Sequence, residues 1–354
     1  MAGEITPHEN LKSYYGKILA STKDLKTKAC CCDGEPGSPA IRKILGSLPN
    51  EILARSYGCG SPIPAALAGC TVLDLGCGAG RDVYLLSSLV GPAGFVIGVD
   101  MTDEQLATAR KHLAGQMRVF GYAQPNVDFR QGYIEDLHAL GIGDNSVDVV
   151  ISNCVINLSP NKEMVFKEIF RVLKPGGELY FSDVFAGCRL PPRLMDDPVL
   201  HGECIAGAMY IEDFRRLLTR LDCPDYRLVD KRKIALDNPE TEAKVGMVDF
   251  YSLTVRAFKL NNLEDICEDY GQVATYQGTI PDQPHAFDLD DHHRFITNKP
   301  MLVCGNTAAM LTDTRFAKHF RVSGDRATHF GPFACGPAAG KAAADNDNPG
   351  GACC

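Results

Sequence analysis

The chain has 354 residues, 45% of them apolar, which is enough for a packed core with two domains or one domain and an appendage. Its formal net charge of −8 argues against nucleic-acid binding, which needs a basic face, and a small-molecule substrate fits better. No apolar run approaches the ~20 residues that span a bilayer, and the first residues lack a signal-peptide pattern. We therefore expect a cytoplasmic protein with reduced thiols and no membrane partner.

Apolar runs alternate with helical segments in the first half of the chain. Residues 9–28 are interpreted as an N-terminal helical arm. The expected strands are 71–75, 95–100, a third beginning at 127, 147–151 and 178–184. The expected helices between them are 80–90, 103–120 and 161–173. This alternation predicts an α/β fold whose parallel sheet is covered by helices on both faces.

The pattern becomes less regular after residue 186. Residues 199–221 look helical, 226–229 extended and 250–260 like a long strand, and from 261 to about 334 turns separate short extended pieces. We predict four parts: an N-terminal arm with a cysteine cluster (1–69), the main α/β domain (70–260), a smaller C-terminal α+β domain (261–334) and a disordered tail ending in cysteines (335–354).

The first expected strand leads into a glycine-rich loop, Asp74-Leu75-Gly76-Cys77-Gly78-Ala79-Gly80. Glycines let the backbone turn tightly and approach a ligand closely. Arg81 stands where a dinucleotide-binding loop would place its third glycine. Asp74 suits a cationic amine better than a pyrophosphate, and Asp100 ends the second strand, where an acidic residue can bind ribose hydroxyls. These features favour S-adenosylmethionine over NAD, the alternative being a tight turn without a ligand.

The rest of the pocket is expected along the carboxyl edge of the sheet. Gly132-Tyr133-Ile134-Glu135 follows the third strand, and we expect it to contact adenine. Glu135 is equally well explained as a solvated surface acid. Ser152-Asn153-Cys154 follows the fourth strand at the same edge.

Fifteen cysteines are too few for a disulfide scaffold in a chain of this length. Cys70, Cys188 and Cys223 are interpreted as buried, inert cysteines. The clusters Cys30-Cys31-Cys32 and Cys353-Cys354 lie in polar stretches, which suggests metal or redox chemistry.

Cys59, Cys154 and Cys204 could converge above the sheet edge. Structural zinc sites commonly use close cysteine pairs and four ligands, whereas these three cysteines are widely separated. Three thiolates suit a soft, three-coordinate ion. Trivalent arsenic fits, because it takes three sulfurs and keeps a lone pair that can attack a sulfonium methyl group.

With these cysteine contexts the chain resembles the arsenite S-adenosylmethionine methyltransferases over most of residues 10–335. The glycine-rich loop is common to many methyltransferases, but the four cysteine contexts together are specific. The matching segments are residues 25–30, 57–60, 73–78, 98–102, 132–135, 152–158, 173–184 and 202–204.

The resemblance implies a Rossmann-like class I methyltransferase fold and the methylation of arsenite and methylarsenite for arsenic detoxification. It implies that Cys59, Cys154 and Cys204 bind arsenic and that Cys30 forms a disulfide, with glutathione or thioredoxin as reductant. Many relatives have a second cysteine where this chain has Ile156. Cys31, Cys32, Cys353 and Cys354 go beyond the shared core, so the identity of the resolving thiol stays open. The residues expected to bind the cofactor are Tyr57, Asp74, Gly76, Gly78, Asp100, Met101, Ile134, Glu135 and Asn153.

Two other functions stay open. A methyltransferase acting on an organic molecule such as a quinone or sterol would use the same fold and loop, but it would not need three thiolates. A non-catalytic arsenic- or metal-binding protein would use the vicinal cysteines, but it would leave Asp74, the loop glycines and Asp100 without a role.

Overall fold

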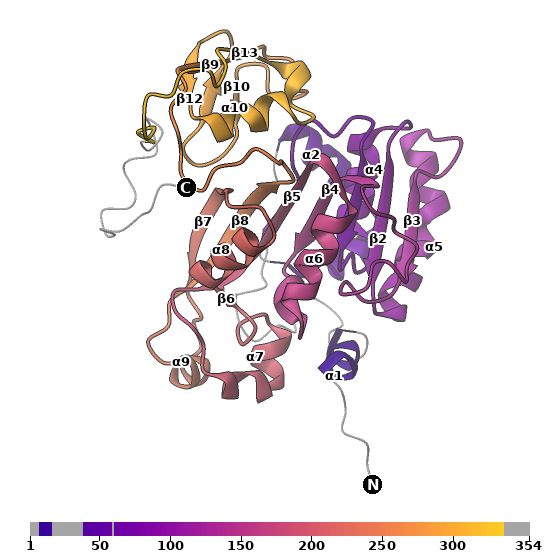
Figure 1. Ribbon diagram of the computed structural model, residues 1–354. Coiled ribbons are helices and arrows are strands. Elements are labelled where there is room, and N and C mark those ends of the chain that lie inside the picture. The colour runs from indigo at the N-terminus through magenta and orange to yellow at the C-terminus, as the bar shows by residue number, and fades with distance from the viewer. Residues whose placement is uncertain (1–6, 16–37, 59, 336–354) are drawn as a thin grey trace.

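The computed structural model describes residues 7–15, 38–58 and 60–335. A large mixed sheet with helices on both faces carries a smaller unit at one end (Figure 1). The strand order of the large sheet is β3-β2-β1-β4-β5-β8-β7, and the short β6 pairs with β5.

The first five strands are parallel, as the alternation of strands and helices predicts. Along β1, Val72 belongs to the apolar core on one face of the sheet and Leu73 to the core on the other, so both faces are buried. The strands are β1 (Thr71–Leu75), β2 (Phe95–Asp100), β3 (Val127–Gln131), β4 (Val147–Asn153) and β5 (Leu173–Ala186).

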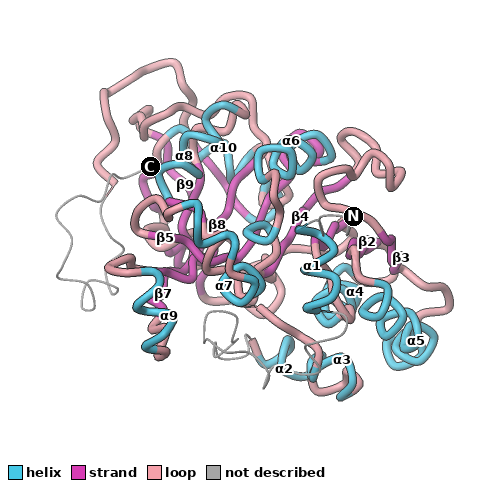
Figure 2. Tube along the Cα trace, turned by 90° about the horizontal axis from the view of Figure 1, so that it is seen from below, coloured by secondary structure: helices cyan, strands magenta, loops and turns pink. Residues whose placement is uncertain are grey.

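Helices cover the two faces in separate layers (Figure 2). One layer holds α4 (Arg81–Val90) and α5 (Asp103–Phe120), and the other holds α6 (Lys162–Val172) and α8 (Ile211–Arg220). Two short helices that the sequence did not predict, α2 (Pro39–Leu45) and α3 (Asn50–Ala54), extend the α4–α5 layer. Ile52 of α3 is fully buried there, so part of the region expected to be an arm belongs to the core.

The last two strands run antiparallel, so the sheet is mixed rather than parallel throughout. β8 (Phe250–Phe258) pairs with β5 along nine registered positions, and β7 (Tyr226–Ile234) pairs with β8 on its other side. Between them lies the short helix α9 (Pro239–Val245). β7 and β8 are thus consecutive along the chain and adjacent in the sheet, as is usual for antiparallel strands.

The helix expected over residues 199–221 is wrong as one element. It divides into α7 (Pro198–Gly202), the short β6 (Met209–Tyr210) and α8. Cys204 has a φ of 63°, which no α-helix accommodates. A Cβ on Gly207 would lie 2.0 Å from the carbonyl oxygen of Asn157, so this turn packs tightly against the loop after β4.

The smaller unit contains a three-stranded antiparallel sheet, a two-stranded hairpin and one helix. Its core is aromatic, with Phe287, Phe295 and Phe316 fully buried. The helix was not located by the sequence, which indicated only turns and short extended pieces. The elements are β9 (Gln272–Tyr276), β10 (Ala286–Asp288), β11 (Arg294–Ile296), β12 (Met301–Val303), α10 (Gly305–Thr312) and β13 (Phe320–Ser323).

The smaller unit docks where β5 begins and β8 ends, while α1 (Pro7–Ser13) and α7 lie at the opposite end of the sheet (Figure 1). Buried Glu178 of β5 forms ion pairs with Arg256 of β8 and with Arg315 of the smaller unit. Among the described residues, no helix is both long and apolar enough to cross a bilayer.

Candidate active site

The glycine-rich loop joins β1 to α4 at the carboxyl edge of the sheet. Gly76 and Gly80 have φ values of 72° and 88°, in the left-handed region that favours glycine. A Cβ on Gly76 would lie 2.3 Å from a methyl carbon of Val155. The amides of Gly76 and Cys77 donate to the carbonyl of Val99, at 2.8 and 3.0 Å, and so fix the loop to β2. The loop therefore leaves room for a ligand above the ends of the strands.

Asp74 is a buried acid with an unsatisfied oxygen. Its Oδ2 atom is enclosed and finds no hydrogen-bond partner in the described part of the chain. Burial raises the pKa of Asp74 well above its ordinary value, and the nearby carboxylates of Asp82 and Asp100 raise it further. A cationic amine bound at Asp74 would satisfy the free oxygen and lower this pKa.

Asp100 ties the end of β2 to the glycine-rich loop. One carboxylate oxygen accepts from the Gly78 amide and the other from the Thr102 amide, both at 2.8 Å. Burial raises the pKa of Asp100, although these hydrogen bonds oppose the shift. Each oxygen keeps a lone pair for a ligand hydroxyl, so this acid can bind a ribose as well as support the loop.

All nine predicted cofactor-binding residues line one cavity of about 1050 Å³, its open mouth included. Sequence reasoning did not predict the contribution of α1 and the residues after it, which reach the same cavity through His8, Leu11 and Tyr15. The Gln105 side chain donates to the Tyr15 carbonyl at 3.2 Å and holds this segment against α5. Nothing in the spacing of residues 7–15 indicates that they close over a site on the sheet.

Glu135 lies in this cavity and is not a solvated surface acid. The Ser159 hydroxyl donates to its Oε1 atom at 2.5 Å, and the His8 ring nitrogen lies 3.2 Å from the same oxygen. Glu135 therefore joins the loop after β3 to α1 and to the loop after β4 at the mouth of the cavity.

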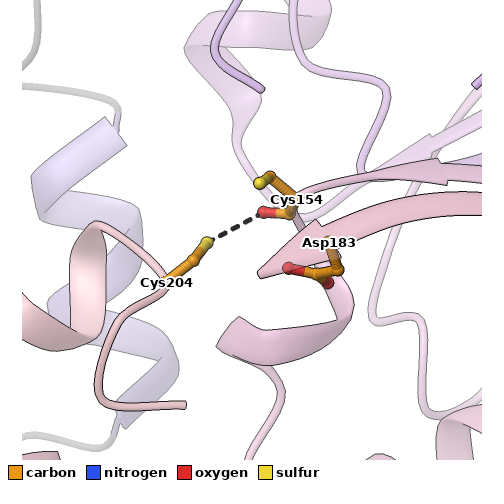
Figure 3. Close-up of side chains that lie close together, drawn as sticks. All are labelled: Cys154, Asp183 and Cys204. Carbon is orange, nitrogen blue, oxygen red and sulfur yellow. Dashed lines mark hydrogen bonds between the residues drawn. The ribbon is translucent and has the colours of Figure 1, made fainter. Parts of the chain in front are cut away.

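Two of the predicted arsenic-binding cysteines meet beside this cavity (Figure 3). Cys154 directly follows β4 and lines the cavity, and Cys204 follows α7 and is fully buried. The Cys204 thiol donates to the Cys154 carbonyl at 3.1 Å. Their sulfurs and a carboxylate oxygen of Asp183 all lie within 4.8 Å of one another.

Cys154 is disulfide-bonded, whereas the other described cysteines form no disulfide. Cys188, which the sequence analysis expected to be buried, is exposed, because it lies in the loop after β5. Cys59 and Cys30 lie outside the described residues, as do Cys31, Cys32, Cys353 and Cys354. The flanks of position 59 pack against β4. The side-chain amide of Asn153 donates to the Gly60 carbonyl at 2.9 Å, and a Cβ on Gly58 would lie 2.6 Å from the Asn153 side chain.

Asp183 is a site residue that sequence reasoning missed. Burial raises its pKa to about 7, although the amides of Val184 and Asn157 donate to it and Lys162 attracts its negative charge. Burial lowers the pKa of Lys162, and the negative charges of Asp183, Cys204 and Glu135 oppose this shift. The available signal was a polar pair, Ser182-Asp183, near the carboxyl end of this strand and between apolar neighbours.

The fold and this cavity define a methyltransferase. A family model described as "Methyltransferase domain" matches residues 67–222, which contain the glycine-rich loop and β1 to β5. A second model, described as "Arsenite methyltransferase C-terminal domain", matches residues 270–348.

Similarity over most of the chain identifies the family. An arsenite methyltransferase of Aquipseudomonas alcaligenes is 53% identical over 330 residues, which cover 93% of this chain and 94% of that one. The crystal structure of an arsenic(III) S-adenosylmethionine methyltransferase from Chlamydomonas reinhardtii is 51% identical and superposes with a TM-score of 0.81, covering 84% of this chain and 100% of that one. The chain therefore belongs to the arsenite methyltransferase family.

Similarity to an enzyme for an organic substrate is confined to a shorter segment. A demethylmenaquinone methyltransferase of Lactococcus lactis is 40% identical over 113 residues, or 32% of this chain and 41% of that one. The smaller C-terminal unit has its counterpart among arsenite methyltransferases.

Proposed function

We propose that this chain transfers a methyl group from S-adenosylmethionine to trivalent arsenic bound by cysteine thiolates. The observation that carries the proposal is the approach of Cys154 and Cys204, 50 positions apart in sequence, at the edge of the cavity that holds Asp74 and Asp100. An enzyme for a quinone or a sterol would have no use for two convergent sulfurs there.

The residues of the cavity fit S-adenosylmethionine. The unsatisfied oxygen of Asp74 suits the ammonium group of the methionine part, and Asp100 suits the ribose hydroxyls. Met101 and Ile134 offer apolar contacts to adenine, with Glu135 and Asn153 at the polar edge. Bound there, the cofactor supplies an electrophilic methyl group.

The cysteines would bind arsenite by exchange, because each thiol proton leaves with one arsenic-bound hydroxyl as water. We assign this role to Cys59, Cys154 and Cys204, which follows the family resemblance. Soft sulfur ligands suit arsenic and leave its lone pair available as the nucleophile. The role of Cys59 is proposed from sequence alone.

Methylation by the lone pair makes arsenic formally pentavalent, so two electrons must be returned in each cycle. A thiol pair that closes to a disulfide supplies two electrons, and we propose Cys30 as one partner. Cys154 cannot bind arsenic while it is disulfide-bonded, so a reductant must first open its disulfide. Glutathione or thioredoxin in the cytoplasm is the proposed source of electrons.

The direct test uses purified full-length protein, labelled S-adenosylmethionine, arsenite and a thiol. We expect labelled methylarsenicals, and Cys204→Ser should remove them because a hydroxyl is a hard, poorly ionised ligand. Cys188→Ser, at an exposed free cysteine, is the matched control and should keep native turnover. Label appearing in an added demethylquinone, with none in arsenic, would refute the proposal.

A further inference from the structure

Three cysteines of the smaller unit come together away from the active site. Cys304 immediately precedes α10, Cys267 precedes β9, and Cys335 ends the described chain. The Cys304 sulfur is in hydrogen-bonding contact with the thiols of both other cysteines. None of the three forms a disulfide; Cys267 and Cys304 are buried, and Cys335 is half-buried.

Backbone hydrogen bonds hold the three segments in place. The Gly305 amide donates to the Glu268 carbonyl at 3.0 Å, which brings the start of α10 beside residue 267. The Phe333 amide donates to the Cys267 carbonyl at 2.8 Å, and Glu268 forms a β-bridge with Pro332. These bonds hold three segments that are distant in sequence side by side. The backbone therefore sets the positions of the three cysteines.

The surroundings of Cys304 stabilise a thiolate. Its sulfur caps α10 and accepts from the Thr307 amide at 3.4 Å, and the Arg227 guanidinium lies 3.8 Å away. Hydrogen bonds from Cys267 and then Cys335 lower the pKa of Cys304, and Arg227 lowers it further, whereas burial opposes them. A nucleophilic sulfur thus lies between the two other cysteines.

This cluster is separate from the catalytic cavity. None of its cysteines lines that cavity. The smaller unit contacts β5 at Glu178, and the catalytic thiols adjoin Asp183, five residues or about 16 Å further along the same strand. Figure 1 shows the smaller unit and the helices of the catalytic end at opposite ends of the sheet.

We propose that Cys267, Cys304 and Cys335 form a second binding site for trivalent arsenicals. Arsenite would exchange its three hydroxyls for the Cys304 thiolate and the two neighbouring thiols, and would release two molecules of water and one hydroxide ion, with no change in oxidation state. A methylated arsenical with two hydroxyls would engage Cys304 and one neighbour. The half-buried Cys335 gives the ligand a route in from solvent.

The surroundings favour arsenic over zinc. Besides the two cysteines, the side chains that form hydrogen bonds with the Cys304 sulfur in the described structure are Thr307 and Arg227. Neither ligates zinc, which takes four ligands in structural sites, and the guanidinium repels a dication. A neutral arsenic trithiolate carries no such penalty. Only the choice of arsenic rests on the proposed function; the convergence of the thiols does not.

The test counts arsenic atoms per chain in reduced, full-length protein after incubation with arsenite and desalting, by plasma mass spectrometry. We expect Cys304→Ser and Cys335→Ser each to hold one arsenic atom fewer than the unmodified protein. Cys335→Ser changes a half-buried position, so this variant should fold, and its melting temperature by circular dichroism should match that of the unmodified protein. Two free cysteines outside the cluster, exposed Cys188 and buried Cys223, give matched serine variants that should keep the full count.

Two results would overturn the site. One is an unchanged arsenic count in both cluster variants. The other is purified protein holding one zinc per chain that Cys304→Ser removes. Methyl transfer separates this inference from the proposed function: Cys335→Ser should keep the native turnover number, while Cys204→Ser should lose turnover but keep the cluster's arsenic.

Discussion

Cys154 and Cys204 both adopt left-handed backbone conformations, with φ values of 57° and 63°. Such conformations disfavour residues other than glycine, and they persist where surrounding structure enforces them. Here the Cys154 amide donates to the Ser182 carbonyl at 2.8 Å, and the Cys204 amide to the His201 carbonyl at 3.1 Å. The strain at both cysteines is therefore supported by the elements that bring their sulfurs beside Asp183.

Asp183 should make stability depend on pH. Its pKa is about 7 in the folded chain and 3.8 ordinarily, so the folded state holds its proton more tightly. This contribution is fully present below pH 3.8 and is lost as pH rises through 7. It amounts to roughly 4 kcal/mol, since each pKa unit is about 1.4 kcal/mol.

The variant Asp183→Asn cannot titrate, so it should lose less stability than the unmodified chain between pH 5 and pH 8. Denaturant unfolding at the two pH values gives the change in unfolding free energy with pH for each protein, and these two changes are compared. Any pH-independent effect of the Asp183→Asn substitution on stability cancels in this comparison. Parallel pH profiles would show that Asp183 does not titrate as described.

At the residue scale, the rule that ligands bind beyond the carboxyl ends of parallel strands predicted much of the cavity lining, from Asp74 and Asp100 to Asn153 and Cys154. Their assignment to the cofactor or to arsenic stays a prediction. The rule did not extend to Asp183, because this residue lies within β5, three positions before its carboxyl end, and not beyond it. It could not find His8, which reaches the cavity from a helix whose sequence position says nothing about its docking.

At the element scale, β1, β2 and α5 lie where the sequence predicts them, because apolar runs and helical periodicity agree with the local backbone. The predicted helix over 199–221 failed because the tertiary structure decides its middle. Gly207 faces the Asn157 carbonyl, and Cys204 has a left-handed φ of 63° that ends the helix. Short elements such as α2 and α10 were missed because seven or eight residues show little periodicity.

The glycine-rich loop allows a matched comparison of two alanine substitutions. Gly76→Ala adds a Cβ 2.3 Å from Val155 at a φ of 72°, whereas Gly78→Ala, at a φ of 51°, meets no atom within 4 Å. We expect Gly78→Ala to cost about 1–2 kcal/mol of stability from the backbone alone. Gly76→Ala should cost a further ~1–3 kcal/mol from overpacking.

Urea unfolding of the two variants measures these costs, and Gly76→Ala combined with Val155→Ala should regain part of the additional loss. Equal destabilisation by Gly76→Ala and Gly78→Ala would contradict the packing of the loop against Val155.

At the scale of the whole molecule, the sequence predicted a main α/β domain and a smaller C-terminal domain among its four parts, but not how these two join. Glu178 of β5, Arg256 of β8 and Arg315 of the smaller unit form one buried charged cluster. Arg315 also donates to the Ala65 carbonyl at 2.9 Å, so the chain before β1 is tied to the same point. Such pairing depends on residues far apart in sequence, and local patterns do not reveal it.

This cluster leads to a prediction about cooperativity. Glu178→Gln would leave two largely buried guanidinium groups without their carboxylate, which typically costs about 3–5 kcal/mol. Because the carboxylate joins both units, we expect the smaller unit to loosen first, so calorimetry should show a second transition below the main one. Arg189→Met removes an arginine from an exposed ion pair with Asp213 and is the matched control; it should leave the melting profile almost unchanged, because solvent screens that pair. A single transition at the native temperature in Glu178→Gln would mean that apolar packing around Phe258 and Phe316 alone holds the units together.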